Sequence, residues 1–159
     1  MSNRVPEELS PIEKQAIERI RALRFSHEED LSSILKNPAR AMHNIILTFH
    51  GHVKLRMAPI ANELGVEMRT LERAFNEEIG KTMLQCQIDA RLGLAHSLLS
   101  MIPPTKLSVI ANLLGYDEVR DFARFFHKHM HETPSAWGRR EREKTKKRER
   151  LASGVREPI

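Results

Sequence analysis

The chain has 159 residues, of which 30% are charged and 40% hydrophobic, a balance typical of soluble globular proteins. Its single cysteine, Cys86, excludes an intramolecular disulfide and a cysteine-based zinc site. The sequence has no signal-peptide core and no apolar run long enough to span a bilayer, so we predict a cytoplasmic protein with no membrane partner.

The net charge of +5 is unevenly distributed along the chain. Residues 1–30 have a net charge of −2, residues 31–137 of +2 and residues 138–159 of +5. Because the basic excess lies in the last segment, bulk charge does not by itself make the central segment a nucleic-acid binder. A nucleic-acid function therefore depends on where particular arginines point.

Two short helices are predicted within residues 1–37. Ser10-Pro11-Ile12-Glu13 is a capping box with proline at the first helical position, and the apolar spacing after it predicts a helix over residues 11–24. Ser26-His27-Glu28-Glu29 is a second capping box, and Asn37-Pro38 ends the helix that it starts. We expect the apolar stripes of this N-terminal hairpin to pack against the rest of the chain, in preference to forming a dimer or partner surface.

The next predicted helix covers residues 39–49 and stops before Gly51. After it, a six-residue sequence occurs almost identically twice: residues 60–65 are Ile-Ala-Asn-Glu-Leu-Gly, and residues 110–115 are Ile-Ala-Asn-Leu-Leu-Gly. Each copy predicts a helix, a turn at the glycine and a second helix, which together form a helix-turn-helix. The small alanine lets the second helix cross close over the first, and the glycine allows a left-handed turn. We place the two units at about residues 55–80 and 107–131.

The second helix of each copy has two arginines, four residues apart, on its outward face. Side chains at this spacing lie one above the other, so Arg69 pairs with Arg73 and Arg120 with Arg124 as adjacent cations. Guanidinium groups suit guanine edges and phosphates. The alternative is a pair of helical hairpins in a bundle whose arginines are merely solvated, and the duplication disfavours it.

A single long helix is predicted between the two units, from residue 82 to residue 100. Thr82 is its N-cap, and Pro103-Pro104 ends it. Some 18 residues at about 1.5 Å each span roughly 27 Å, and successive major grooves on one face of B-DNA lie about 34 Å apart. We therefore predict that this helix holds the second helices, residues 67–78 and 118–129, over neighbouring grooves of one asymmetric site.

The residues of this chain that match the pattern of a known family are Ile60-Ala61, Leu64-Gly65, Leu71, Phe75, Gly80, Arg91, Ala95, Leu98-Leu99, Ile110-Ala111, Gly115-Tyr116, Phe122, Arg124, Phe126 and Thr133-Pro134-Ser135. On these residues, the chain from about residue 39 to 139 resembles the DNA-binding domain of the AraC/XylS family of bacterial transcription regulators. The resemblance implies an all-α fold of two helix-turn-helix subdomains joined by a linker helix. The domain would cover residues 38–138, between an N-terminal helical extension (1–37) and a basic tail (139–159). Many relatives have a β-sheet effector-binding domain before this part, and 37 residues of helical pattern cannot build one.

Three positions depart from the pattern of the family. Arg120 stands where relatives usually have serine, so the sequence preference of the second unit is expected to differ. His131 stands where they usually have glycine, and it must take a backbone conformation that glycine accepts more easily. Gly138 replaces a common arginine.

The outward faces and the resemblance together give the candidate site residues. For contacts with base edges we predict Met68, Arg69, Glu72, Arg73, Val119, Arg120 and Arg124. For phosphate contacts or support we predict Arg56, Thr70, Asn76, Arg91, Ser108, His127 and Lys128. Ser108 is also the expected N-cap of its helix, and Arg56, at that place in the first copy, could bind phosphate directly. Glu72 either accepts a hydrogen bond from cytosine or restrains Arg69 and Arg73.

Residues 139–150 are rich in basic side chains and have no apolar stripe. This pattern predicts a solvated helix or a disordered arm. Its role is either solubility or a sequence-independent attraction to phosphates that adds affinity without specificity.

Metal and catalytic sites are disfavoured by the residue patterns. His127 and His131 can share a helix face, but His129 cannot, and two histidines without a suitable further ligand fall short of a metal site. No glycine-rich phosphate loop follows a strand pattern, no serine lies in a nucleophile elbow, and Cys86 is expected in the core. We therefore predict no enzyme activity, no cofactor and no metal.

These observations predict a sequence-specific transcription regulator that binds double-stranded DNA as a monomer, with RNA polymerase as a second candidate partner. The alternative is a helical adaptor that binds a protein through its N-terminal hairpin and uses the repeats as a scaffold. The two differ in whether replacing the four outward arginines abolishes DNA affinity.

Overall fold

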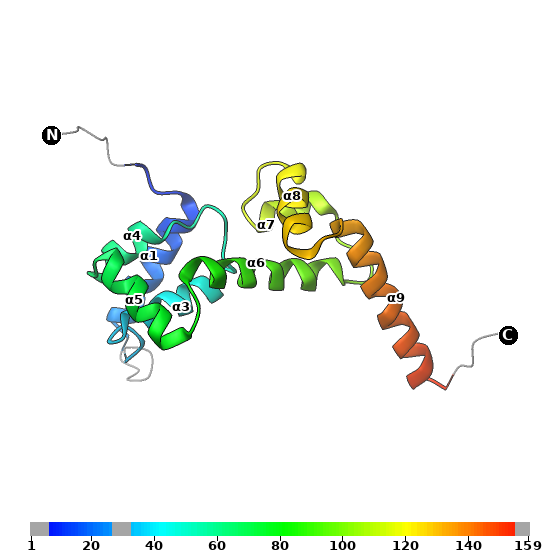
Figure 1. Ribbon diagram of the computed structural model, residues 1–159, viewed down its shortest axis with the longest axis horizontal. Helices are drawn as coiled ribbons and strands as arrows, with labels where there is room; N and C mark the ends of the chain where they lie inside the picture. Colours follow the sequence, from blue (N-terminus) through cyan, green and yellow to red (C-terminus); the bar gives the residue numbers. More distant parts are fainter. Residues whose placement is uncertain (1–6, 27–32, 155–159) are drawn as a thin grey trace. The chain divides into compact units, whose positions relative to one another are not determined.

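The computed structural model describes residues 7–26 and 33–154, and all the long elements of regular structure within them are helices (Figure 1). This confirms the predicted all-α fold. The helices are α1 (Pro11–Arg24), α3 (Pro38–Thr48), α4 (Met57–Leu64), α5 (Met68–Ile79), α6 (Met83–Leu99), α7 (Leu107–Leu113), α8 (Val119–Met130) and α9 (Pro134–Ala152). The chain divides into two compact units, unit 1 (Met1–Arg91) and unit 2 (Leu92–Ile159), and α6 contributes residues to both.

Helix α1 begins at the capping box that the sequence predicts. The Ser10 hydroxyl accepts a hydrogen bond from the Glu13 amide at 3.3 Å, and the Ser10 amide donates to the Glu13 carboxylate at 2.8 Å. The Ser10 hydroxyl also donates to the carbonyl of Lys54 at 2.9 Å, which ties the start of α1 to the loop before α4. The second predicted capping box falls mainly on residues 27–32, which lie outside the described part of the chain.

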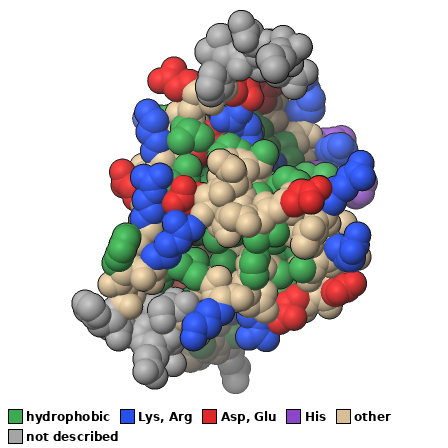
Figure 2. Space-filling view, turned by 90° about the vertical axis from the view of Figure 1, so that its left-hand side faces the viewer, with side chains coloured by type: hydrophobic (Ala, Val, Ile, Leu, Met, Phe, Trp, Pro, Cys, Tyr) green, Lys and Arg blue, Asp and Glu red, His purple; other side chains and the backbone are tan. Residues whose placement is uncertain are grey.

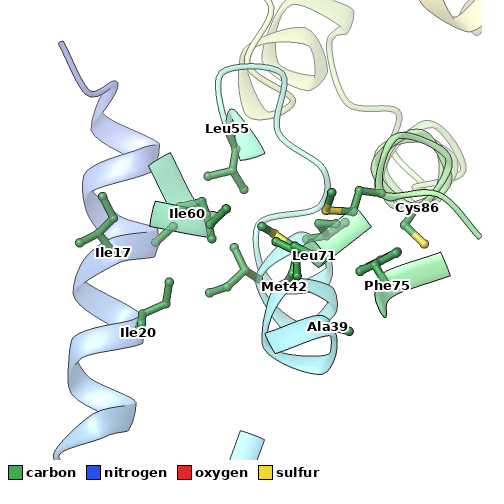
Figure 3. Close-up of a cluster of buried hydrophobic side chains, with 14 residues drawn as sticks. Ile17, Ile20, Ala39, Met42, Leu55, Ile60, Leu71, Phe75 and Cys86 are labelled. Carbon is green, nitrogen blue, oxygen red and sulfur yellow. The ribbon is translucent and has the colours of Figure 1, made fainter. Parts of the chain in front are cut away.

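The core of unit 1 is formed by apolar side chains from α1, α3, α4, α5 and the start of α6 (Figure 3). Ile17 and Ile20 of α1 lie beside Ile60 of α4, so the predicted packing of the first N-terminal stripe against the chain is confirmed. Cys86 is buried in the same cluster, as predicted, and burial raises the pKa of its thiol. The fully buried members of the cluster include Ile20, Met42, Ile45, Ile46, Ile60, Leu71 and Phe75.

Two local signals fix where α3 ends and α6 begins. The Thr82 hydroxyl accepts from the Gln85 amide at 3.1 Å, as expected of an N-cap. Gly51, which follows α3, has a φ of +60°, and a Cβ atom there would lie 2.1 Å from the carbonyl oxygen of Gln87. The turn after α3 therefore approaches α6 more closely than any side chain would allow.

Unit 2 has its own core, in which α6, α7, α8 and α9 take part. Phe122 and Phe126 of α8 are completely buried, and Phe126 meets the indole of Trp137 at 6.0 Å between ring centroids. The imidazole of His96 stacks on Trp137, with centroids 4.3 Å apart and planes 17° apart. The remaining buried apolar residues are Ala95, Leu99, Ile110, Ala111 and Leu114.

Helix α9 is held to unit 2 by its first turns. Thr133 caps it by accepting from the Ala136 amide at 3.2 Å, and Arg142 donates to the carbonyl of Leu99 at 2.7 Å. A Cβ atom at Gly138 would lie 2.9 Å from that carbonyl oxygen, so this close approach accounts for the glycine at a position where relatives usually have arginine. The basic segment continues the helix to Ala152, and the division of the chain at residues 37 and 138 stays a prediction.

Candidate nucleic-acid interface

Both copies of the repeat form a helix-turn-helix with matching turn geometry. Gly65 has a φ of 72° and Gly115 a φ of 94°. The next residue in each copy donates its amide back to the buried alanine of the first helix: Val66 to Ala61 at 3.1 Å and Tyr116 to Ala111 at 2.9 Å. The glycine of each copy therefore has the left-handed conformation that the sequence predicts for it, whereas the helix-crossing role of the alanine stays a prediction.

Helix α5 buries one face and exposes the predicted contact residues on the other. Leu71 and Phe75 are completely buried. Arg69, Glu72, Arg73 and Asn76 are exposed, as is Thr70, whereas Met68 is half-buried against the core of unit 1. Within the described part of the chain neither arginine has an ion pair, so the alternative in which Glu72 restrains them gains no support.

Helix α8 repeats this arrangement in unit 2. Its exposed residues include Val119, Arg120, Arg124, His127 and Lys128. Arg124 is 3.9 Å from the Asp121 carboxylate and its side chain is 78% exposed, so this pair is weak. The helix ends at His131 with a φ of 60°, which confirms the expected left-handed conformation.

Several arginines elsewhere in the chain are paired with carboxylates. Arg21 and Arg24 both contact Glu63, at 3.0 and 3.2 Å. Arg40 contacts Glu78 at 2.7 Å, and Arg140 contacts Glu132. Among the described residues, Arg69, Arg73 and Arg120 have no such partner, which leaves their guanidinium groups available to an external anion or base edge.

A groove of about 740 Å³ lies beside the exposed face of α5. It brings together four of the predicted contact residues with the first turn of α6. The lining residues are Arg69, Glu72, Arg73, Asn76, Thr82, Met83 and Leu84. Two cations, an amide and a carboxylate therefore surround one hollow: the cations and the amide can donate to base edges or phosphates, and the carboxylate can accept from a base edge.

Arg56 is held by acidic side chains, which the local sequence pattern did not reveal. Its Nε and Nη2 atoms each donate to the Glu13 carboxylate at 2.8 Å, its backbone amide donates at 3.0 Å, and Nη1 contacts Glu7. Burial alone would raise the pKa of the Glu13 carboxyl, but the hydrogen bonds from Arg56 and Ser10 outweigh it and lower the pKa to about 2. Of the two roles predicted for Arg56, these contacts favour support over phosphate binding.

Arg91 and Ser108, which were also predicted for phosphate contacts or support, have different surroundings from each other. The Nε atom of Arg91 donates to the carbonyl of Gly51 at 2.9 Å, so its contacts favour support of the turn after α3. The prediction that Ser108 caps its helix is wrong, because α7 begins at Leu107 and Lys106 is at the N-cap position. The burial of Ile110 sets the register of this helix, as the burial of Ile60 does in the first copy, where Arg56 is at the N-cap. Ser108 is exposed in the first turn of α7.

On the face that Figure 2 shows, basic, acidic and apolar side chains are interspersed, and the charged ones do not form a patch of one sign. Among the described residues, no three histidine, cysteine or acidic side chains lie close enough together to hold a metal ion. None of the described helices is both long and apolar enough to cross a membrane.

Comparison with known proteins identifies the family. A family model described as a helix-turn-helix domain matches residues 60–140, just over half of the chain. No curated protein sequence matches. The solved structure of the C-terminal domain of AraT, a response regulator from Geobacillus stearothermophilus, has the same fold with a TM-score of 0.55 and 22% sequence identity, over 84% of this chain and 88% of that one. With its duplicated helix-turn-helix and this family match, the chain belongs to the AraC/XylS family of DNA-binding transcription regulators.

Proposed function

We propose that this protein binds double-stranded DNA sequence-specifically by placing α5 and α8 in successive major grooves. The observation that supports this most directly is the pair of exposed arginines at matching positions of both copies, in a protein whose other arginines are often paired. Arg69, Arg73 and Arg120 have no ion pair among the described residues and Arg124 has only a weak one, so these guanidinium groups give up no strong internal contact when they turn to a guanine edge or a phosphate.

Each predicted residue has a role in this proposal. Arg69, Arg73, Arg120 and Arg124 contact base edges, and Glu72 accepts from cytosine. Met68 and Val119 offer apolar contacts for thymine methyl groups. Phosphate contacts come from Thr70, Asn76, Ser108, His127 and Lys128, while Arg56 and Arg91 support the fold around them.

Helix α6 is the spacer in this proposal. Its 17 residues span roughly 25 Å, a length suited to neighbouring major grooves, which recur about every 34 Å. Because both recognition helices belong to one chain, a monomer suffices and the operator need not be palindromic. The basic end of α9 adds a sequence-independent attraction to phosphates.

The adaptor alternative is less well supported. It needs the apolar stripe of the N-terminal extension to be available to a partner, yet Ala16, Ile17 and Ile20 of α1 are buried in the core of unit 1. In our proposal the protein acts in the cytoplasm, needs no cofactor and performs no catalytic step, and RNA polymerase is a second candidate partner.

The experiment that tests this proposal is a selection of bound fragments from random DNA duplexes. We expect enriched fragments to share two short sequence elements whose centres are about 10 base pairs apart. Enrichment without a shared sequence, or of a single element that persists when all four arginines are replaced by alanine, would contradict it.

A further inference from the structure

The outer face of α7 exposes apolar side chains that the proposed DNA contacts do not use. Val109 is 46% exposed and Leu113 is 51% exposed. The two residues are four positions apart, so they lie on one face of the helix. At the N-terminal end of the helix, Lys106 is exposed and has no ion pair within the described part of the chain.

The repeat shows what covers the corresponding face in unit 1. Lys106 matches Arg56, and Leu113 matches Glu63. In unit 1 this face of α4 is covered by α1, with Glu13 on Arg56 and Arg21 on Glu63 at 3.0 Å. As a result the Glu63 side chain is only 16% exposed.

Apolar contacts complete the docking of α1 on α4. Ile17 and Ile20 belong to the same buried cluster as Ile60 of α4 (Figure 3). The first helix of a repeat copy is therefore, in this protein, a surface on which another amphipathic helix packs. In unit 2 Ile110, which matches Ile60, is buried in the core, but Val109 and Leu113 beside it, which match Pro59 and Glu63, are exposed.

We propose that the face of α7 formed by Lys106, Val109 and Leu113 docks an amphipathic helix of a partner protein, in the way that α4 docks α1. The docked helix has a carboxylate in its first turn, opposite Lys106. Two to three turns later, where α1 has Arg21 and Arg24, it has apolar side chains, because Leu113 takes the place of Glu63.

The occupant is not α1 of a second copy. The apolar stripe of α1 is already buried in unit 1, and Arg21 and Arg24 would lose Glu63 and meet Leu113 instead. Leaving those charges against an apolar surface is unfavourable. This inference is independent of the proposed DNA-binding function.

Two synthetic peptides test the proposal. One has the sequence of residues 10–25 of this chain, and the other has the same sequence with Arg21→Leu and Arg24→Leu. We measure the affinity of each labelled peptide for the full chain by fluorescence anisotropy. The leucine peptide is expected to bind about tenfold more tightly than the arginine peptide, because it buries apolar surface against Leu113.

Substituting a residue of this face shows whether the peptides bind there. Leu113→Glu copies Glu63 and is expected to reverse the order of the two affinities. Leu47→Glu is the matched control, since Leu47 is also 51% exposed but lies on α3, and it should leave both affinities unchanged.

Three outcomes would overturn the proposal. They are the absence of binding by either peptide, an equal effect of Leu113→Glu and Leu47→Glu, and self-association of the chain that Leu113→Glu abolishes. The last outcome would assign this face to a second copy of the protein.

Discussion

The carboxylate of Glu13 accepts two hydrogen bonds from the guanidinium of Arg56, each at 2.8 Å, although the residues are 43 positions apart in the sequence. Glu13 is completely buried, and Arg56 precedes the first helix of the first helix-turn-helix. The N-terminal helix is thus fixed to the DNA-binding part of the chain by a charged contact as well as by apolar packing.

Removing the cation of this pair should destabilise unit 1. We expect Arg56→Ala to lower the free energy of unfolding by about 2 kcal/mol, because a buried carboxylate loses its charged donor. The cost stays moderate because the amides of Ser10 and residue 56 still donate to Glu13. Urea unfolding at pH 7 measures the change, and an unchanged midpoint would show that the pair contributes nothing.

The same pair predicts a dependence of stability on acid. The pKa of Glu13 is lowered in the folded state from 4.5 to about 2. Its contribution is therefore fully present above about pH 4.5 and is lost as the pH falls toward 2. Urea unfolding between pH 2 and 5 checks this, and Glu13→Gln should show a flatter pH dependence than the wild type over that range.

His96 predicts a second pH effect, at milder acidity and in unit 2. Burial lowers the pKa of His96 below 6.5, against a smaller opposing effect of Glu141. Folding therefore favours the neutral imidazole, so stability is full above pH 6.5 and falls as the pH drops below it. The emission of Trp137, the single tryptophan, reports unfolding beside this ring. His96→Gln should weaken the pH dependence of the Trp137 signal between pH 7.5 and 5.5, and an undiminished dependence would assign it to another group.

Because α9 approaches Leu99 closely, we expect a larger side chain at Gly138 to destabilise the protein. Gly138→Ala places a methyl group 2.9 Å from the Leu99 carbonyl oxygen, and we expect it to cost about 1–3 kcal/mol. Gly93→Ala is the control, because nothing lies within 4 Å of a Cβ there, and it should be neutral or stabilise α6 by about 0.5–1 kcal/mol. Thermal unfolding compares the two, and equal melting temperatures would refute the packing interpretation.

Local patterns were sufficient to predict much of the fold. The second helices of both copies begin within one residue of the predicted positions, because Leu71, Phe75, Phe122 and Phe126 mark their buried faces. The caps at Ser10 and Thr82 and the left-handed His131 were also predictable, since each depends on residues close in sequence.

The features that sequence analysis missed depend on residues far apart in the chain. Glu13 was interpreted only as part of a capping box, and no local pattern indicates Arg56 as its partner. The start of α7 was misplaced because core packing, not the best capping residue, determines where that helix begins. The reason for Gly138 became visible only when α9 was seen against the end of α6.

The central claim is that each helix-turn-helix reads its own part of one DNA site. The most direct test uses the selected duplex and two derivatives, each with one of its two sequence elements scrambled. Equilibrium binding is measured for the wild type and for the double variants Arg69→Ala/Arg73→Ala and Arg120→Ala/Arg124→Ala.

Scrambling either element should cost the wild type about 1–3 kcal/mol for each lost arginine contact. Each double variant should become insensitive to scrambling of one element and stay sensitive to the other, with opposite elements for the two variants. If both variants lose discrimination at the same element, or both keep full discrimination at both elements, the two copies do not read separate parts of the site and the claim is contradicted.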